Sequence, residues 1–485
     1  MSIATPTKNI PDDDDQPFYE PHHKVYPQKV KGTFRRAKWV VLIITLGIYY
    51  LTPFIRWDRG PGAPDQAVLI DLAHRRFYFF FIEIWPQEVY YITGLLVLAA
   101  LILFLMNAVA GRVWCGYLCP QTVWTDLFLA IERWTEGDRR ERMKNDAAPM
   151  TPNVLARKAL KHFLWLMTAW WTGGAWVLYF SDAPTLVHDL ATLQAPLIAY
   201  IWIGILTFTT YSLAGFMREQ VCLYMCPWPR IQAALTDEDA FNVTYRFDRG
   251  DPRMSVKKAN AAHARGEPAG DCIDCYQCVA VCPTGVDIRD GPSLGCIQCG
   301  LCIDACDTVM TKLDRPTRLI AYDTDQNVRA RMEGKPQTAH IVRPRTLLYT
   351  GVIVVVGAIM LFALATRVTT SVNVIHDRNP EYVVLSDGGV RNAYTLRVLN
   401  KHTTARTFAF SVDLPDSTLE VVGAETADGR LVAEVGADQT RELRAIVSVD
   451  HSVGDTQPIR FTITDTEDGS TASATDNFRG PGEAK

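Results

Sequence analysis

The stretch C-I-D-C-Y-Q-C-V-A-V-C-P at residues 272–283 is followed at residues 296–306 by C-I-Q-C-G-L-C-I-D-A-C. Each run has three cysteines with two residues between neighbours, and a fourth after three more residues. This spacing matches bacterial two-cluster ferredoxins, in which the fourth cysteine of each run ligates the cluster of the other run. We therefore predict two [4Fe–4S] clusters, one held by Cys272, Cys275, Cys278 and Cys306 and the other by Cys296, Cys299, Cys302 and Cys282.

Zinc is the alternative metal for closely spaced cysteines. Zinc sites take four ligands, typically as two C-x2-C pairs with a longer gap, and eight cysteines in two triplet-plus-one runs fit that pattern poorly. The second run ends in Cys306-Asp307 rather than Cys-Pro. Because proline only shapes the turn after the ligand, this departure leaves the cluster prediction unchanged. Such clusters bind no substrate; they move single electrons.

The other four cysteines form a repeated motif. W-C-G-Y-L-C-P contains Cys115 and Cys119, and C-L-Y-M-C-P contains Cys222 and Cys226, each after an apolar segment and a basic residue. If the motif is helical, its two cysteines share one face about 5–6 Å apart, and the following proline places them at a helix break. Four such sulfurs are donors that Cu(I) prefers. We predict that these four cysteines are catalytic and bind copper; another metal, a dithiol and simple packing remain open, since free cysteine is often buried.

Five apolar stretches are long enough to cross a bilayer, which takes about 20 residues per helix. They lie at residues 37–55, 89–110, 163–180, 196–216 and 347–365. The third is the weakest, because Gly173 and Gly174 interrupt it, and the third and fourth have buried soluble helices as an alternative. The first 36 residues are polar, so the first stretch is expected to be an uncleaved anchor.

The basic residues predict the orientation. Lys and Arg number seventeen between residues 217 and 345, eight between 111 and 160, and none between 181 and 195. The positive-inside rule then places the N-terminus in the cytoplasm, and five crossings place the C-terminus outside. No cysteine follows Ala365, as expected if the thiols stay on the reducing side.

The segment after residue 370 changes to short alternating runs separated by polar turns such as Asp387-Gly388-Gly389. Seven strands in about 115 residues suggest an immunoglobulin-like sandwich. The candidates are Ala393–Leu399, Thr407–Val412, Leu419–Val422, Leu431–Val435, Leu443–Val449, Ile459–Thr464 and Ala472–Asn477. No catalytic group is evident there, and His376, His402 and His451 are expected at the surface.

These parts together predict a polytopic α-helical membrane protein of about five transmembrane helices, with an inserted two-[4Fe–4S] ferredoxin-like domain and a C-terminal all-β immunoglobulin-like sandwich. The expected order is a cytoplasmic tail (1–36), a four-helix membrane region with both C-x3-C-P motifs (37–231), the cytoplasmic ferredoxin-like domain (232–345), a fifth transmembrane helix (346–366) and a periplasmic domain (370–485). The net charge of −4 over 485 residues gives no general affinity for nucleic acid. There is no haem-attachment C-x-x-C-H, dinucleotide fingerprint or P-loop.

This arrangement resembles the CcoG family, also called FixG or RdxA. The resemblance rests on both C-x3-C-P motifs, both ferredoxin runs, the fifth helix and the terminal sandwich with Asn392-Ala393-Tyr394 and Asn400-Lys401. The family is known as membrane-bound cupric reductases that help load copper into cbb-type cytochrome c oxidase in bacterial inner membranes. The resemblance implies the same activity here, with the C-x3-C-P cysteines as the copper or redox site. It implies as partners the lipid bilayer, the oxidase or its copper chaperones, and an electron donor that is a ferredoxin, a flavoprotein or a quinol.

Two other functions remain open. Similar membrane ferredoxins of the NapH group pass quinol electrons to partner reductases, so a quinol dehydrogenase is the first alternative. The second is a non-catalytic assembly scaffold, whose sandwich docks an oxidase subunit and whose clusters are structural.

Overall fold

The computed structural model describes residues 24–59, 63–367, 370–402, 404–437, 439–450 and 456–481. Most of the expected N-terminal tail and His451 therefore lie outside the described residues. The chain divides into two compact units. The first comprises Met1–Tyr50, Leu95–Val177 and Gln194–Val354, and the second Leu51–Gly94, Leu178–Leu193 and Val355–Lys485.

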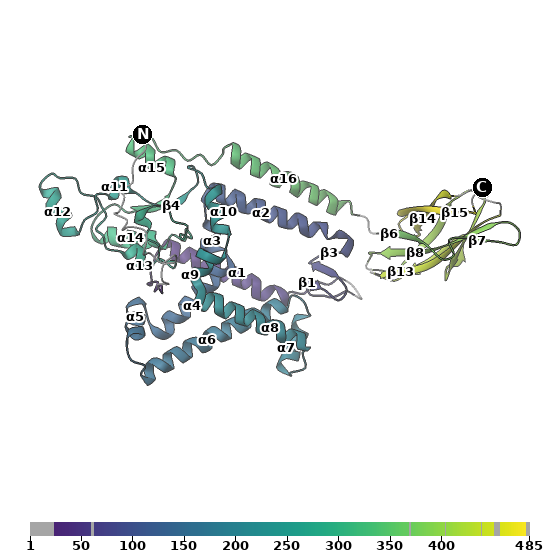
Figure 1. Ribbon diagram of the computed structural model, residues 1–485, viewed down its shortest axis with the longest axis horizontal. Helices are drawn as coiled ribbons and strands as arrows, with labels where there is room; N and C mark the ends of the chain where they lie inside the picture. Colours follow the sequence, from purple (N-terminus) through teal and green to yellow (C-terminus); the bar gives the residue numbers. More distant parts are fainter. Residues whose placement is uncertain are drawn as a thin grey trace, which may run out of the picture. The chain divides into compact units, whose positions relative to one another are not determined.

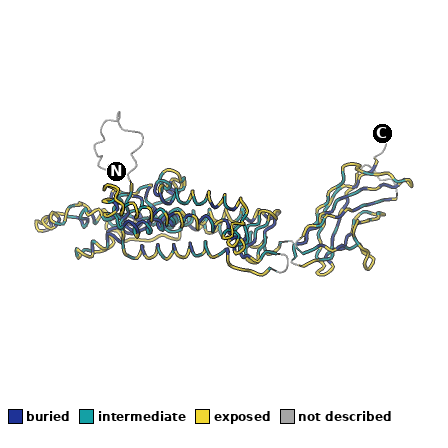
Figure 2. The backbone as a smooth tube through the Cα atoms, turned by 90° about the horizontal axis from the view of Figure 1, so that it is seen from below, coloured by how far each residue is buried: buried dark blue, intermediate teal, exposed yellow. Residues whose placement is uncertain are grey.

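Within the described residues, four helices are long and apolar enough to cross a membrane: Thr33–Phe54, Tyr90–Ala110, Leu197–Met225 and Pro344–Ala365. They contain α1 (Thr33–Leu51), α2 (Tyr90–Ala110), α8 (Leu197–Thr210) and α16 (Pro344–Ala365) (Figure 1). Most of their residues are exposed or half-buried (Figure 2). Apolar helices with such exposure suit a lipid environment, and they indicate that the protein is associated with a membrane.

The third predicted span folds as α6 (Pro152–Val177) but is not among these four helices. Charged Arg157, Lys158 and Lys161 occupy its first half. Gly173 does not interrupt the helix; a Cβ there would lie 3.0 Å from the Ile203 carbonyl oxygen in α8. Gly173 thus permits a close helix–helix contact. The number of crossings, four or five, remains a prediction.

Each C-x3-C-P motif is followed by a new helix. Within the first motif, α3 (Val113–Tyr117) ends, and α4 (Pro120–Glu136) begins with the proline of the motif, Pro120. The second motif is preceded by the π-helical η3 (Tyr211–Met217) and by α9 (Arg218–Gln220), and its first four residues lie in the π-helical η4 (Val221–Met225). Helix α10 (Trp228–Leu235) then begins directly after Pro227. Proline suits a helix start, where its missing N–H donor has no intrahelical acceptor. The sequence repeat is therefore also a repeat of local structure.

Buried ion pairs fix α4 within the first unit. Asp126 pairs with Arg35 of α1 at 2.8 Å, and Glu132 pairs with Arg142 of α5 (Arg139–Ala147) at 2.7 Å. Burial raises the pKa of Glu132, but the charges of Arg218 and Arg142 outweigh that effect and hold the pKa below its ordinary value. Helix α4, which starts at the first motif, is thereby tied to α1, to α5 and, through Arg218, to the segment just before the second motif.

The ferredoxin-like region is closed by a two-stranded antiparallel sheet. Strand β4 (Asn242–Tyr245) pairs with β5 (Ile320–Asp323), and both cysteine runs lie between them in the chain. The shared core contains Tyr245, Ile303 and Met310 together with three of the cysteines. The shorter helices of this region are α11 (Phe247–Gly250), α12 (Val256–Ala264), α13 (Gln277–Ala280), η5 (Ile288–Asp290), α14 (Leu301–Lys312) and α15 (Asp325–Met332).

The second unit contains a small sheet in a segment for which the sequence predicted no strands. Strands β1 (Val68–Asp71), β2 (Arg76–Phe79) and β3 (Ile82–Ile84) form an antiparallel meander. Gln66 lies beside it and donates through Nε2 to the carbonyl oxygen of Leu178 at 2.8 Å. Helix α7 (Ala183–Ala191) follows.

The C-terminal segment is a two-sheet β structure, and all seven predicted strands are present. One sheet has the order β10-β13-β8-β6, with β7 also on β8, and the other has the order β11-β12-β9-β14-β15. The strands are β6 (Thr370–His376), β7 (Val383–Val384), β8 (Val390–Asn400), β9 (Arg406–Asp413), β10 (Ser417–Val422), β11 (Glu425–Ala427), β12 (Arg430–Val435), β13 (Gln439–Val449), β14 (Thr456–Asp465) and β15 (Thr471–Arg479). Buried Tyr394, Phe408 and Phe461 fill the core between the sheets.

Candidate electron-transfer site

The two cysteine runs share one backbone shape. Asp274 and Tyr276 in the first run have φ of +52° and +55°, and Gln298 and Gly300 at the matching positions of the second have φ of +55° and +72°. Where right- and left-handed residues alternate along a backbone, successive N–H groups form a concavity, a shape found at iron–sulfur sites. The repeat in spacing therefore produces a repeat in backbone conformation.

Cys306 lies with the three cysteines of the first run. Its thiol is within electrostatic reach of Cys278, Cys275 and Cys272. The same four residues line one small cavity, whose wall also includes Tyr245, Met310 and Leu319. Cys306 is on α14, so this helix brings the last cysteine of the second run to the first.

Cys282 lies with the three cysteines of the second run. The Cys302 thiol is within electrostatic reach of Cys299, Cys296 and Cys282, and also of Cys278 from the other group. Cys282 follows the four-residue helix α13 rather than lying on it, and its Sγ is 3.3 Å from Thr284 Oγ1. The two groups of four are thus adjacent to each other.

The chemistry of these groups fits iron–sulfur clusters. Burial raises the pKa of Cys278, Cys296 and Cys306 to about 12. Metal ligation requires thiolates, and a buried thiolate needs an adjacent cation. Two groups of four cysteines match the ligand number of two [4Fe–4S] clusters. The assignment of ligands to each cluster remains a prediction.

The four C-x3-C-P cysteines come together from the two halves of the repeat. Cys115 is within electrostatic reach of Cys119, Cys222 and Cys226, and its thiol donates a hydrogen bond to Gln232 Oε1 at 3.2 Å. Burial, followed by these neighbouring thiols, raises the pKa of Cys115 to about 12. The helix breaks at the second cysteine of each motif, since Cys119 and Cys226 have extended backbones. The four cysteines, which are far apart in the sequence, thus lie near one another in the fold.

The four C-x3-C-P cysteines lie against the loop of the second ferredoxin run. A Cβ at Gly116 would be 2.7 Å from the Ile297 carbonyl oxygen and 3.1 Å from Cys299 Cα. From the other motif, Leu223 Cδ2 is 3.0 Å from the place of a Cβ on Gly295. Both motifs therefore touch the backbone segment that carries Cys296 and Cys299.

A buried guanidinium occupies the space between the thiol group and this loop. Arg112 donates through Nη1 to the Leu294 carbonyl oxygen at 2.7 Å and through Nη2 to the Pro229 carbonyl oxygen at 2.9 Å. No carboxylate among the described residues pairs with it. Burial lowers the pKa of Arg112, opposed by the charges of Cys115 and Cys296. Arg112 therefore places its positive charge near Cys115 of the C-x3-C-P cysteines and near Cys296 of the second ferredoxin run.

A second cation, Lys38, lies near cysteines of both the second C-x3-C-P motif and the second ferredoxin run. It is buried in α1, 3.7 Å from Asp126, and within electrostatic reach of Cys222 and Cys299. The sequence interpretation did not single out Lys38 or Gln232. A charged residue within an apolar span is a signal of function and identifies Lys38 in retrospect, whereas Gln232 carries no such signal.

Three family models match the chain. A "4Fe-4S dicluster domain" matches residues 217–325, a "4Fe-4S binding domain" matches residues 92–135, and "IG-like fold at C-terminal of FixG, putative oxidoreductase" matches residues 360–481. The chain therefore carries iron–sulfur domains of the 4Fe-4S type and a C-terminal immunoglobulin-like domain. The 92–135 match includes the first C-x3-C-P motif.

Full-length relatives cover most of the chain. Nitrogen fixation protein FixG of Rhizobium meliloti is 51% identical, over 89% of this chain and 88% of its own length. Proteins RdxB and RdxA of Cereibacter sphaeroides are 51% and 47% identical, over 83% and 82% of this chain and 84% of each relative. A solved structure, a FixG-related protein from Vibrio parahaemolyticus, is 22% identical over 24% of this chain and 98% of its own, with a TM-score of 0.20. The resemblance seen in the motifs is confirmed, and the chain belongs to the FixG family.

Proposed function

We propose that this protein is a membrane-bound electron-transfer protein that reduces Cu(II) to Cu(I) at Cys115, Cys119, Cys222 and Cys226. The Cu(I) would serve the assembly of a cbb-type cytochrome c oxidase in a bacterial inner membrane. The chain belongs to a family whose model is described as a putative oxidoreductase, which supports a redox role.

One observation carries the proposal: four thiols from distant parts of the chain lie near one another, beside the loop of the second cysteine run. Soft sulfur ligands favour Cu(I) over Cu(II). A site that binds the product more tightly than the substrate lowers the cost of reduction. The thiols therefore supply both a binding site and a driving force.

The surrounding residues prepare the site for this reaction. When bound, [4Fe–4S] clusters supply one-electron transfer, and one electron converts one Cu(II) to Cu(I). Arg112 places a positive charge between the two sulfur groups, which stabilises negative charge on either. Gln232 accepts from the Cys115 thiol and orients that sulfur. Tyr117 fixes the motif on the loop through the Cys299 carbonyl oxygen.

The electron balance requires an external reductant. Each Cu(II) consumes one electron, so a reduced ferredoxin, a flavoprotein or a quinol must donate at the cysteine runs. Cys275 is exposed, whereas Cys272, Cys278 and Cys306 of the same group are buried. The first group is therefore the one that a soluble donor would approach most closely.

The direct test is anaerobic purification of the full chain, followed by iron and sulfide counting and stopped-flow mixing with Cu(II). Two clusters require about eight iron atoms per chain. Dithionite-reduced protein should be reoxidised by Cu(II) and should yield one Cu(I), trapped by a Cu(I)-specific chelator, per electron. An iron count of about twelve would instead place a third cluster on the C-x3-C-P thiols and contradict the copper site.

The variant Cys115→Ala/Cys222→Ala sharpens this test. It should keep cluster absorbance and lose Cu(II)-dependent reoxidation; unchanged kinetics would remove the site assignment. Rapid cluster reduction by a quinol analogue, without any response to Cu(II), would identify a quinol dehydrogenase. A scaffold would keep its function when cluster cysteines are changed to serine and lose it when the residues after Thr370 are deleted.

A further inference from the structure

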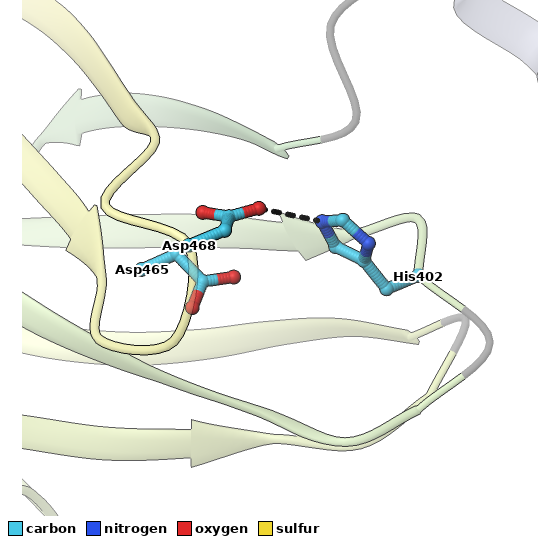
Figure 3. A group of neighbouring side chains, drawn as sticks. All are labelled: His402, Asp465 and Asp468. Atoms are coloured by element: carbon cyan, nitrogen blue, oxygen red, sulfur yellow. Dashed lines mark ion pairs between the residues drawn. The ribbon is translucent and has the colours of Figure 1, made fainter.

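A histidine and two aspartates meet at one end of the C-terminal sandwich (Figure 3). His402 follows β8, Asp465 ends β14, and Asp468 lies in the turn that leads to β15. One ligand atom from each residue lies within 4.8 Å of the other two. His402 Nε2 is 3.9 Å from Asp468 Oδ2. Three side chains with metal-ligating atoms thus point at one another.

Two of these atoms are buried without a hydrogen-bond partner among the described residues. They are His402 Nε2 and Asp465 Oδ2. The whole Asp465 residue is 0% exposed, and its other oxygen, Oδ1, accepts from the Glu467 N–H at 2.8 Å. A buried carboxylate oxygen without a donor is costly. A bound cation would satisfy both atoms together.

The neighbouring Arg406 side chain does not donate a hydrogen bond to Asp465 Oδ2. Arg406 Nη1 lies 3.9 Å from Asp465 Oδ2, too far for a hydrogen bond, and 2.6 Å from Glu467 Oε2. Its closest carboxylate is therefore Glu467 at the rim. Arg406 offsets part of the charge of Asp465 but leaves its Oδ2 without a donor.

The turn that carries both aspartates is held by its own backbone. Asp465 N–H donates to the Ser470 carbonyl oxygen at 2.8 Å, and Gly469 N–H donates to the Asp465 carbonyl oxygen at 3.1 Å. Gly469 has a φ of +73°, which suits glycine. Asp468 accepts from the Ser470 N–H at 2.8 Å. The two carboxylates are therefore presented by a closed turn rather than by a loose loop.

We propose that His402, Asp465 and Asp468 bind one divalent transition-metal ion. One imidazole nitrogen and two carboxylate oxygens are a donor set for Zn²⁺ and Cu²⁺, with metal–ligand distances of about 2.0–2.2 Å. The exposed Asp468 closes the present separations by rotating its side chain. Because divalent affinity is highest for Cu²⁺, Cu²⁺ is the ion that this site holds best. Solvent completes the coordination at the exposed side.

This site is independent of the proposed function of the C-x3-C-P thiols. It uses nitrogen and oxygen donors, which suit Cu²⁺, whereas the thiols suit Cu(I). The sequence interpretation placed His402 at the surface, but its side chain is 20% exposed. The spacing Asp465-x2-Asp468-Gly469 was the available signal, and the approach of His402 to it depends on the fold.

The test uses the full chain with Cys115, Cys119, Cys222 and Cys226 changed to alanine, so that the thiols cannot reduce the added ion. One equivalent of Cu²⁺ should give an electron paramagnetic resonance spectrum with coupling to a single imidazole nitrogen. His402→Gln should abolish that coupling and weaken Cu²⁺ binding by at least about tenfold. The same nitrogen-coupled spectrum in His402→Gln would overturn the proposal.

A matched control is available in the same domain. His376 Nε2 lies 2.7 Å from Asn392 Oδ1, so His376→Gln removes an imidazole that already has a partner. It should leave the Cu²⁺ spectrum unchanged. Zn²⁺ should raise the unfolding temperature of the parent and of His376→Gln but not of Asp465→Asn. Equal stabilisation of all three proteins would show that Zn²⁺ binds elsewhere, and stabilisation of none would show that it does not bind. In either case the three side chains would be only an internal ion pair.

Discussion

The Tyr117 hydroxyl donates a hydrogen bond to the carbonyl oxygen of Cys299 at 2.9 Å. Tyr117 belongs to the first C-x3-C-P motif and Cys299 to the second ferredoxin run, 182 residues apart. The bond joins the thiol group to the loop that carries three predicted cluster ligands. It makes the two sulfur groups one structural unit, and the first three predictions test that unit.

Gly116→Ala should separate the two sulfur groups. Its Cβ would stand 2.7 Å from the Ile297 carbonyl oxygen and 3.1 Å from Cys299 Cα, both backbone atoms that cannot rotate away. We expect Cu(II)-dependent reoxidation of the clusters to slow on the order of tenfold, with cluster absorbance retained. Gly204→Ala, where nothing lies within 4 Å of the new Cβ, should behave as the parent. Parental kinetics in Gly116→Ala would show that this contact does not control the transfer.

Gly300→Ala should impair assembly of the second cluster. Gly300 has a φ of +72°, and a Cβ there would lie 2.8 Å from the Phe34 ring. The left-handed backbone costs about 1–2 kcal/mol, and the steric overlap adds about 1–3 kcal/mol. Iron per chain, measured by colorimetry, should fall.

Gly334→Ala separates the two effects. It has a φ of +67° with nothing within 4 Å, so it carries the backbone cost alone and should keep its iron. Equal iron loss in both variants would mean that the overlap with Phe34 is irrelevant.

Arg112→Gln should make the adjacent cluster harder to reduce. The substitution removes a buried positive charge next to Cys296, and the midpoint potential should fall by on the order of 50–100 mV at an effective dielectric constant near 20. Redox titration followed by electron paramagnetic resonance measures this shift. Arg230→Gln removes an exposed charge from α10 and should shift the potential far less. Equal shifts would indicate a general charge effect.

Glu132→Gln should destabilise the first unit strongly. Glu132 pairs with Arg142 at 2.7 Å and with Arg218 at 3.1 Å, and its removal leaves both guanidiniums buried without that carboxylate. We expect a loss of about 3–5 kcal/mol, seen as a lower unfolding temperature in detergent. Glu238→Gln breaks an exposed pair with Arg329 and should cost less than about 1 kcal/mol. Similar costs for both would mean that the buried network adds no stability.

A reporter fusion should decide the number of crossings. Alkaline phosphatase is active only where disulfides form, so with five crossings a fusion after Lys485 should be active. A fusion after Gly266, in the ferredoxin-like region, should be inactive. If α6 does not cross the bilayer while the other four helices do, the activities should be reversed: the fusion after Gly266 should be active and the fusion after Lys485 inactive.

Much of the fold could be predicted from local pattern. The seven strands from Ala393 to Asn477 follow from alternating side chains, and α1, α2, α8 and α16 follow from apolar length. The β1–β3 meander was missed because its strands are only three or four residues long. Helix α6 was ambiguous because its composition lies between that of a lipid-facing helix and a buried one. The grouping of Cys306 with the first run follows an established spacing rule and could be predicted.

The sequence by itself determined the chemistry: which residues carry sulfur, how the runs are spaced, and which segments are apolar. These are properties of neighbouring residues, and they act through backbone conformation and hydropathy. Only the tertiary structure decided that Cys115 meets Cys222, that Arg112 and Lys38 lie beside them, and that His402 meets Asp465. Such contacts join residues scores of positions apart and depend on the packing of whole helices and sheets, which no short pattern encodes.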